Sequence, residues 1–161
     1  MASDITPWML RGYSAVAMVD SAPWRVSGEL WGMDLPSALI EQNTENAEEG
    51  WARRVNAGLA LTVDRHLGRR PDNQGWHVGL LLNAFHSTVT RQAQSGRFWS
   101  VEALGRGGFR WFPSEQERFF VNPYAALGPL VGLDTPRVAG ERFVEVPYQA
   151  VATVQLGWCF R

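Results

Sequence analysis

The chain contains no lysine: its 15 basic side chains are all arginines and are opposed by 16 carboxylates, for a formal net charge of −1. Binding to nucleic acids depends on a basic field that neutralises phosphates, so we expect no nucleic-acid partner. The chain also has no apolar run near the ~18 residues that a membrane-spanning helix needs. A helical membrane protein is therefore excluded.

A single cysteine, Cys159, and a short polar start say little about the cellular compartment. One cysteine cannot form a disulfide within the chain, so the redox environment is not constrained. The segment from Met1 to Asp4 lacks the basic and apolar regions of a secretory signal peptide. Either the chain stays inside the cell, or a signal was removed and a start methionine added. We expect the second, because the rest of the chain looks exported.

The length of 161 residues predicts one domain over residues 1–161, large enough for a closed eight-stranded sheet. Apolar and polar residues alternate along most of this length, which is typical of β-strands with one apolar face. The strictest alternation surrounds Leu59, and a long alternating segment begins at Tyr148 and ends at Phe160. The alternation predicts seven clear strands, at 9–20, 24–33, 51–67, 76–90, 99–112, 119–133 and 148–160.

An antiparallel up-and-down barrel needs an even number of strands, so an eighth strand is expected. We place it from Leu39 to Asn43, which puts both termini on one side of the barrel. Two alternatives are a helical turn opened by Pro36 and a strand upstream of the first residue. Pro123 and Pro129 each remove a ladder donor, so the segment at 119–133 must be bulged or locally unpaired.

Two kinds of barrel fit this alternation. A soluble lipocalin-like barrel points its apolar face inward, whereas a transmembrane barrel points it outward. Several segments exceed the ~9–11 residues that cross a bilayer with tilt. Trp76, Trp111 and Trp158 share the apolar parity beside the same set of turns, and Phe119 joins them. Aromatic side chains at one level are typical of a membrane interface, so the pattern favours the transmembrane barrel.

The polar face combines small residues with charged side chains, which suits a narrow lumen filled by ion pairs. Its charged members are Arg25, Glu29, Arg54, Asp64, Glu102, Arg106 and Arg110. In the first hypothesis, Arg106 and Arg110 pair with the carboxylates and neutralise a closed lumen. These carboxylates are Glu29, Asp64 and Glu102. In the second, aromatic residues of the same parity line a pocket for a small ligand. These aromatic residues are Trp31, Phe85, Phe112 and Tyr124.

Catalytic and metal-binding patterns are weak. His86 and Ser87 are adjacent, so in a strand they point to opposite faces and cannot act as base and nucleophile. A lipid-modifying outer-membrane hydrolase therefore has little support. The three histidines, His66, His77 and His86, lack metal-ligand spacing. We predict no catalytic residue, no metal and no cofactor.

Five short motifs resemble those of a family of small bacterial outer-membrane β-barrel proteins, mostly of uncharacterised function. They are Asp34-Leu35-Pro36, Glu49-Gly50-Trp51, Gly108-Phe109-Arg110-Trp111-Phe112-Pro113, Asn122-Pro123-Tyr124 and Leu156-Gly157-Trp158-Cys159-Phe160. The resemblance spans roughly residues 8–160 and carries over no functional residue. It implies a location in the bacterial outer membrane, contact with outer-membrane lipid, and recognition of the last strand by the barrel-insertion machinery. Arg161, which follows the closing aromatic residue, departs from the family pattern.

The sequence thus predicts an all-β, antiparallel up-and-down transmembrane barrel with a polar lumen filled by side chains. The expected role is structural or interactive, with the acidic loop at 41–50 as contact surface, because an eight-stranded barrel is too narrow for a pore. The alternative is a soluble lipocalin-like barrel that binds an apolar ligand or hosts catalysis in its cavity.

Overall fold

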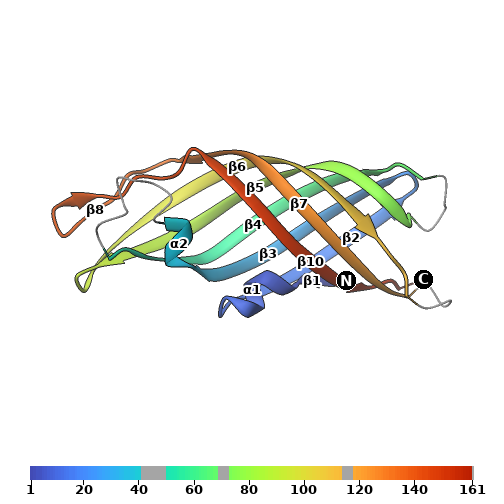
Figure 1. Cartoon of the computed structure of the whole chain (residues 1–161), viewed down its shortest axis with the longest axis horizontal. Helices are drawn as coiled ribbons and strands as arrows, with labels where there is room; N and C mark the ends of the chain where they lie inside the picture. Colours follow the sequence, from blue (N-terminus) through green and yellow to red (C-terminus); the bar gives the residue numbers. More distant parts are fainter. Residues whose placement is uncertain (41–49, 69–72, 114–117, 161) are drawn as a thin grey trace.

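The structure is a computed structural model that describes residues 1–40, 50–68, 73–113 and 118–160. Eight antiparallel strands form a closed barrel in the order β1-β10-β7-β6-β5-β4-β3-β2, and two short strands form a separate hairpin (Figure 1). The elements are β1 (Ala2–Asp4), α1 (Ile5–Met9), β2 (Tyr13–Ser21), β3 (Trp24–Leu35), α2 (Ser37–Ile40), β4 (Ala52–His66), β5 (Gly75–Arg91), β6 (Gln94–Arg110), β7 (Phe119–Gly132), β8 (Arg137–Val138), β9 (Glu141–Arg142) and β10 (Tyr148–Trp158).

The eighth strand is β1, so its predicted position from Leu39 to Asn43 was wrong. Leu39 belongs to the short helix α2, where its N–H donates to the carbonyl of Pro36 at 3.0 Å; residues 41–43 lie outside the described part of the chain. β1 pairs with β10 through Ala2 and Gly157, which closes the barrel. Both termini lie at one end, as predicted, and this is visible in Figure 1.

The prediction for the prolines of β7 is confirmed in its second form, local unpairing. Towards β10 the register is continuous from Phe119 to Pro129. Towards β6 the same register is kept, but pairing is interrupted beside Pro129 and again beside Pro123, and it resumes in a single bridge between Val121 and Trp111. A proline has no N–H to donate to the ladder, so the strand keeps its direction and loses individual bonds.

A β-bulge in β4 overturns one predicted lumen residue, Arg54. The register with both neighbouring strands shifts around Asn56, which is one extra residue on β4. A one-residue shift moves every following side chain to the other face. Arg53 therefore points into the lumen, whereas Arg54 lies outside with its side chain 54% exposed and bonds Asp34 at 2.9 Å.

Three strand boundaries also differ from the prediction. The segment at 9–20 begins as a strand only at Tyr13, because α1 and the turn at Arg11, with a φ of 56°, precede it. The gap expected between the strands at 76–90 and 99–112 is a tight turn through Gln92 and Ala93, both with positive φ, because β5 extends to Arg91 and β6 begins at Gln94. The last strand begins at Tyr148, as predicted, but ends at Trp158 instead of Phe160.

Leucines on the apolar parity of the alternating segments face outward, with Leu59 66% and Leu80 49% exposed. No helix in the described ranges is long and apolar enough to cross a bilayer. At the end opposite the termini, long strands and connections enclose an apolar cluster beyond the charged lumen, which we call the cap. Its buried members are Ile40, Trp51, Val89, Phe98, Val138 and Phe143.

The bulge generates a prediction for two adjacent arginines. Arg53→Ala should lower the free energy of unfolding by about 3 kcal/mol, because it leaves Glu145 buried without a counter-charge. Arg54→Ala should change it by less than about 1 kcal/mol, because its pair with Asp34 is exposed. Urea titration of the refolded protein measures both. Equal costs for the two variants would contradict the inward direction of Arg53.

Candidate functional site

Asp64 lies in the lumen near the end that carries the termini, and three buried side chains surround its carboxylate. Its oxygens lie 3.5 Å from Arg25 Nε, 3.3 Å from Arg106 Nε and 3.6 Å from His77 Nδ1. Gly79 on β5 makes room for this carboxylate, because a Cβ there would lie 2.3 Å from Asp64 Oδ1. Buried guanidinium groups are tolerated only beside a close counter-charge. Asp64 therefore neutralises much of this end of the lumen.

Arg110, which is fully buried, closes the same end. Its Nη1 donates to both carboxylate oxygens of Asp20, at 2.9 and 3.0 Å. The guanidinium carbon lies 4.2 Å from the ring centroid of Phe120 and 4.9 Å from that of Phe112. Stacking on aromatic faces and a paired carboxylate both stabilise a buried arginine. Together, Arg110 and the group around Asp64 form what we call the terminal plug.

Two histidines extend the terminal plug. His66 and His77 are paired across β4 and β5, with ring centroids 5.3 Å apart. Arg25 Nη2 lies 2.9 Å from His66 Nε2; since a guanidinium only donates, the histidine nitrogen accepts. His77 Nε2 lies 2.8 Å from the amide oxygen of Asn122. Sequence reasoning left these histidines apart, because their proximity depends on strand register.

Arg53 closes the other end of the lumen, below the cap. Its guanidinium carbon lies 4.9 Å from the ring centroid of Phe98, 5.5 Å from that of Phe85 and 5.8 Å from that of Phe143. Its Nη1 also donates to Glu145 Oε1. Aromatic rings and a paired carboxylate stabilise this cation inside the lumen. We call this group the cap plug.

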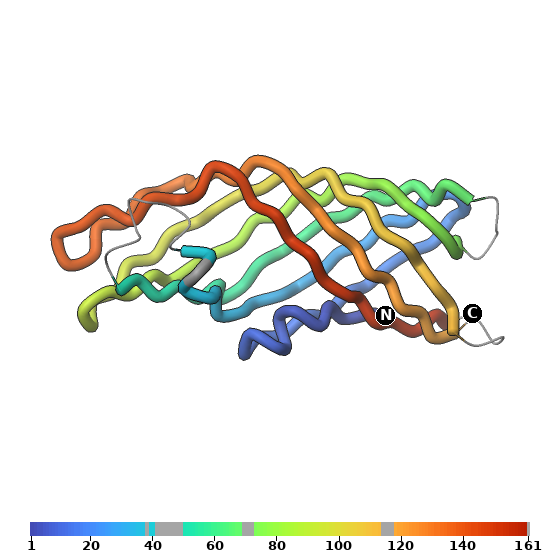
Figure 2. Tube along the Cα trace, in the orientation of Figure 1, coloured from blue at the N-terminus to red at the C-terminus, as the bar shows by residue number. Residues whose placement is uncertain are grey.

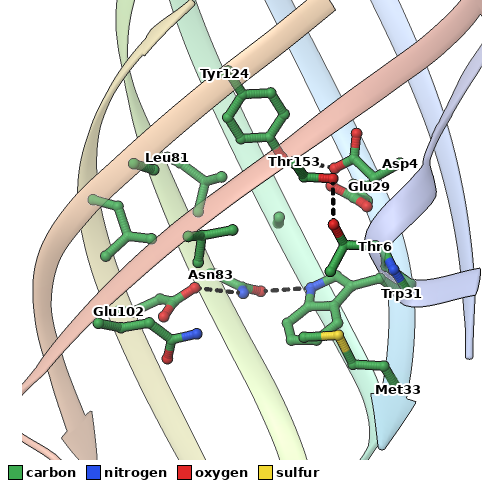
Figure 3. Close-up of a pocket in the computed structure, with 16 residues that line it drawn as sticks. Asp4, Thr6, Glu29, Trp31, Met33, Leu81, Asn83, Glu102, Tyr124 and Thr153 are labelled. Carbon is green, nitrogen blue, oxygen red and sulfur yellow. Dashed lines mark hydrogen bonds between the residues drawn. The ribbon is translucent and has the colours of Figure 1, made fainter. Parts of the chain in front are cut away.

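A cavity of about 60 Å³, open on one side, lies between the two plugs and is drawn in Figure 3. Its lining is mostly apolar, and it also contains three carboxyl side chains. The larger apolar residues are Trp31, Met33, Leu81, Leu104 and Val151, and the carboxyl residues are Asp4, Glu29 and Glu102. A largely apolar cavity with a few polar groups is the usual form of a small-molecule site. This pocket is the candidate functional site.

A chain of hydrogen bonds fixes the first carboxyl group. Trp31 Nε1 donates to Asn83 Oδ1 at 3.1 Å, and Asn83 Nδ2 donates to Glu102 Oε1 at 2.9 Å. The indole lies against Gly58, where a Cβ would meet its ring at 2.5 Å. Because an indole only donates, Asn83 must turn its NH2 towards Glu102. The other oxygen, Glu102 Oε2, is buried and has no hydrogen-bond partner among the described residues.

The other two carboxyl groups lie on the opposite side of the pocket, as Figure 3 shows. Asp4 Oδ2 accepts from the Tyr124 hydroxyl at 2.7 Å, and Glu29 Oε1 accepts from Ser14 Oγ at 2.7 Å. Ser14 Oγ in turn accepts from the backbone N–H of Asp4 at 3.0 Å. Asp4 Oδ1 is buried without a hydrogen-bond partner in the described part of the chain. Acceptor oxygens are therefore available at both sides of the cavity.

The predicted lumen residues other than Arg54 all point inward, but they divide among three groups. Arg25, Asp64, Arg106 and Arg110 belong to the terminal plug, Phe85 to the cap plug, and Glu29, Trp31, Glu102 and Tyr124 to the pocket. The expected pairing was right only for Arg106 with Asp64. Arg110 pairs with Asp20 instead, and neither Glu29 nor Glu102 has a guanidinium partner among the ion pairs of the described residues.

Of the aromatic residues predicted to line a ligand pocket, Trp31 and Tyr124 line this cavity, whereas Phe112 packs in the terminal plug and Phe85 in the cap plug. Sequence reasoning missed Asp4 and Asn83. Asn83 shares the polar parity of β5 and could have been found from it, but Asp4 lies in a strand too short to show a period.

Catalytic arrangements receive no support from the geometry. Ser87 is fully buried in the lumen and accepts from Arg53 Nε at 3.2 Å, while His86 on the opposite face contacts Trp99. Within the described ranges, no three His, Cys, Asp or Glu side chains are grouped to hold a metal ion.

No protein-family model matches the chain, and neither the curated proteins nor the solved structures contain a significant match to it.

The terminal plug generates a prediction about one carboxylate. Asp64→Asn should lower the free energy of unfolding by about 3–5 kcal/mol, because Arg25 and Arg106 would stay buried without their counter-charge. The matched variant Asp34→Asn removes an exposed carboxylate and should cost less than about 1 kcal/mol. Urea titrations of both variants measure the difference. A small cost for Asp64→Asn would mean that the two arginines do not depend on it.

Proposed function

We propose that the protein spans a bacterial outer membrane as a small barrel with a closed polar lumen and a structural or interactive role. The observation that carries the proposal is the direction of the side chains. The leucines and valines of apolar parity on β4 and β5, from Leu59 to Val63 and from Val78 to Leu82, are exposed, while Arg25, Asp64 and Arg106 are enclosed. In water, exposing the apolar side chains and enclosing the charged ones would both lower stability. In a bilayer, the same arrangement is the expected one.

Two properties of the outer surface support a membrane setting, namely the length of the strands and the uncharged outward positions near their middle. The strands β4, β5, β6 and β7 have 15, 17, 17 and 14 residues, which exceeds the ~9–11 needed to cross a bilayer. Outward positions from Leu59 to Val63 and from Trp76 to Leu82 carry no charged side chain. A belt without charge is what the hydrocarbon region requires.

Exposed aromatic residues lie at strand ends, where the water–lipid interface would be. At the end with the termini they are Trp24, Trp76, Trp111 and Trp158. At the other end, Tyr148 begins β10 and is 70% exposed. Tryptophan and tyrosine are enriched at membrane interfaces because one part of the ring system is apolar and another is polar. This distribution supports the proposed orientation of the barrel axis across the membrane.

The two plugs favour a closed barrel over a pore. Arg110 and the group around Asp64 fill the lumen at one end, and Arg53 among its phenylalanines fills it at the other. An interior of eight strands is just wide enough to be filled by side chains. The role therefore falls to surfaces outside the lumen, and the acidic loop predicted at 41–50 is the proposed contact surface for partners. Residues 41–49 of this loop lie outside the described part of the chain.

The soluble lipocalin-like alternative requires the apolar face to line the cavity. The leucines of β4 and β5 that are exposed on the outer face do not fit this requirement. A last strand from Tyr148 to Phe160 that ends in aromatic residues fits recognition by the barrel-insertion machinery, and outer-membrane lipid would surround the barrel.

Substituting arginine for an outward leucine tests the membrane setting. Leu61→Arg should lower the free energy of unfolding in lipid vesicles by about 2–4 kcal/mol, because residue 61 would lie near the bilayer centre. Leu67→Arg, beyond the end of the same strand, should cost no more than about 1 kcal/mol, because it would lie near the interface. Urea titration in vesicles compares them. If both variants cost little, Leu61 faces water and the proposal is wrong.

Reconstitution into planar bilayers tests the closed lumen. Detergent-refolded protein should migrate faster on a gel before heating than after it, which identifies the folded barrel. The same sample should give no channel currents, because both ends of the lumen are filled by side chains. Stable open-channel currents from folded protein would contradict the proposed role while leaving the membrane setting intact.

A further inference from the structure

The wall of the barrel is incomplete beside the pocket. β1 pairs with β10 only through Ala2, Ser3 and Asp4, opposite residues 155–157. Within the described residues, no strand pairs with β10 on that side from Tyr148 to Val154. The chain instead leaves the wall after β1, and α1 lies between β10 and the pair β2 and β3 (Figure 2). We call this gap in the strand pairing the seam.

Only a few bonds hold α1 at the seam. Thr6 Oγ1 lies 2.8 Å from Thr153 Oγ1 on β10, and the Asp34 N–H donates to the Leu10 carbonyl at 2.9 Å. On the outer side of α1, Trp8 is 59% and Met9 77% exposed. A strand in this place would close the wall with a ladder of backbone bonds. The short helix leaves fewer bonds to break.

The pocket reaches the seam. Gln149, Val151 and Met33 face the lumen but are only half-buried, whereas Leu104 on the opposite wall is 1% exposed. Gln149 also lines a second hollow of about 120 Å³, which continues along the seam towards Leu35. In a closed barrel, inward side chains at mid-strand would be covered on all sides. The lumen is thus sealed along its axis by the plugs and open sideways.

The charge of the pocket differs from that of the plugs. Each carboxylate in the plugs has an arginine: Asp64 and Asp20 in one, Glu145 in the other. The pocket lining contains three carboxyl groups and no basic side chain. Two of these groups, Asp4 and Glu102, are 3% and 7% exposed and each has one buried oxygen without a hydrogen-bond partner among the described residues.

We propose that the pocket binds the protonated amine of a molecule whose apolar chain lies along the seam, and that the molecule enters sideways from the membrane through the seam. The buried carboxyl oxygens supply the acceptors that an ammonium group needs, and Met33, Val151 and Leu35 beside the seam cover the chain. A fatty acid or a phosphate would face like charge with no arginine to receive it. The entry route rests on the proposed membrane setting, whereas the preference for an amine does not.

The indole signal of Trp31 reports on the pocket, because its N–H begins the hydrogen-bond chain to Glu102. Each of the eight tryptophans gives one indole resonance in a nitrogen–proton spectrum, and Trp31→Phe identifies the signal from the pocket. Decylamine added to the protein in a neutral detergent should shift this signal to saturation. Decanoate at equal concentration should shift only indoles on the outer surface. If decylamine does not shift the Trp31 signal, or if decanoate shifts it equally, the proposal is overturned.

A matched pair of variants tests the carboxyl group. Glu102→Gln should raise the decylamine concentration at half-saturation by about tenfold or more, because a charge-assisted bond is lost. Glu141→Gln, at an exposed position on β9, should leave it unchanged. Heat-modifiable migration establishes that each variant folds. Wild-type affinity in folded Glu102→Gln overturns the proposal, and if this variant does not fold, the comparison of decylamine with decanoate decides.

Two substitutions by tryptophan test the route. Gln149→Trp would narrow the seam from the lumen side, whereas Leu82→Trp would add the same ring to the outer face of β5, away from the seam. In vesicles, decylamine binding should be at least about tenfold slower for Gln149→Trp and unchanged for Leu82→Trp. Equal rates would rule out entry through the seam. If Leu61→Arg leaves the free energy of unfolding in vesicles unchanged while the protein in detergent still prefers decylamine to decanoate, the proposed membrane setting is wrong and the assignment of the pocket stands.

Discussion

Four arginines are buried in the barrel lumen, and the arrangement of the interior depends on how each is compensated. Arg25 and Arg106 share Asp64, Arg110 bonds Asp20, and Arg53 bonds Glu145. A buried guanidinium costs several kcal/mol unless a carboxylate and further contacts accompany it. The aromatic rings around Arg53 and Arg110 supply such contacts and also fill volume. The requirement for compensation therefore explains why ion pairs and aromatic rings gather at the two ends of the lumen.

The carboxyl groups between the plugs do not follow this rule, and this contrast identifies the pocket. Asp4 and Glu102 accept hydrogen bonds from Tyr124 and Asn83, but no described arginine pairs with either. A fold that needed only stability could fill this space with apolar side chains at lower cost. A free acceptor in an apolar cavity is more readily explained by a ligand that completes it. This physical argument underlies the proposed preference for an amine.

The shortness of β1 connects the fold to the proposed entry route. Three residues close the barrel at the end with the termini, and beyond Asp4 the chain forms α1 instead of continuing the ladder. The remainder of β10 keeps its pairs with β7 and has no strand partner on its other side among the described residues. A barrel removes strand edges by closing completely. Here part of one edge is covered only by a short helix, and the pocket lies directly behind it.

The sequence by itself determined the fold class, most of the strands and the composition of the two faces, because the period of two is a local property of each strand. It correctly assigned Arg25, Asp64, Glu102 and Tyr124 to one face. Three features came only from the tertiary structure. The bulge at Asn56 exchanges Arg53 for Arg54, β1 is too short to show a period, and the partners of Arg110 and Glu102 depend on strand register. These depend on contacts between distant segments, and alternation within a strand carries no information about which residues lie opposite it.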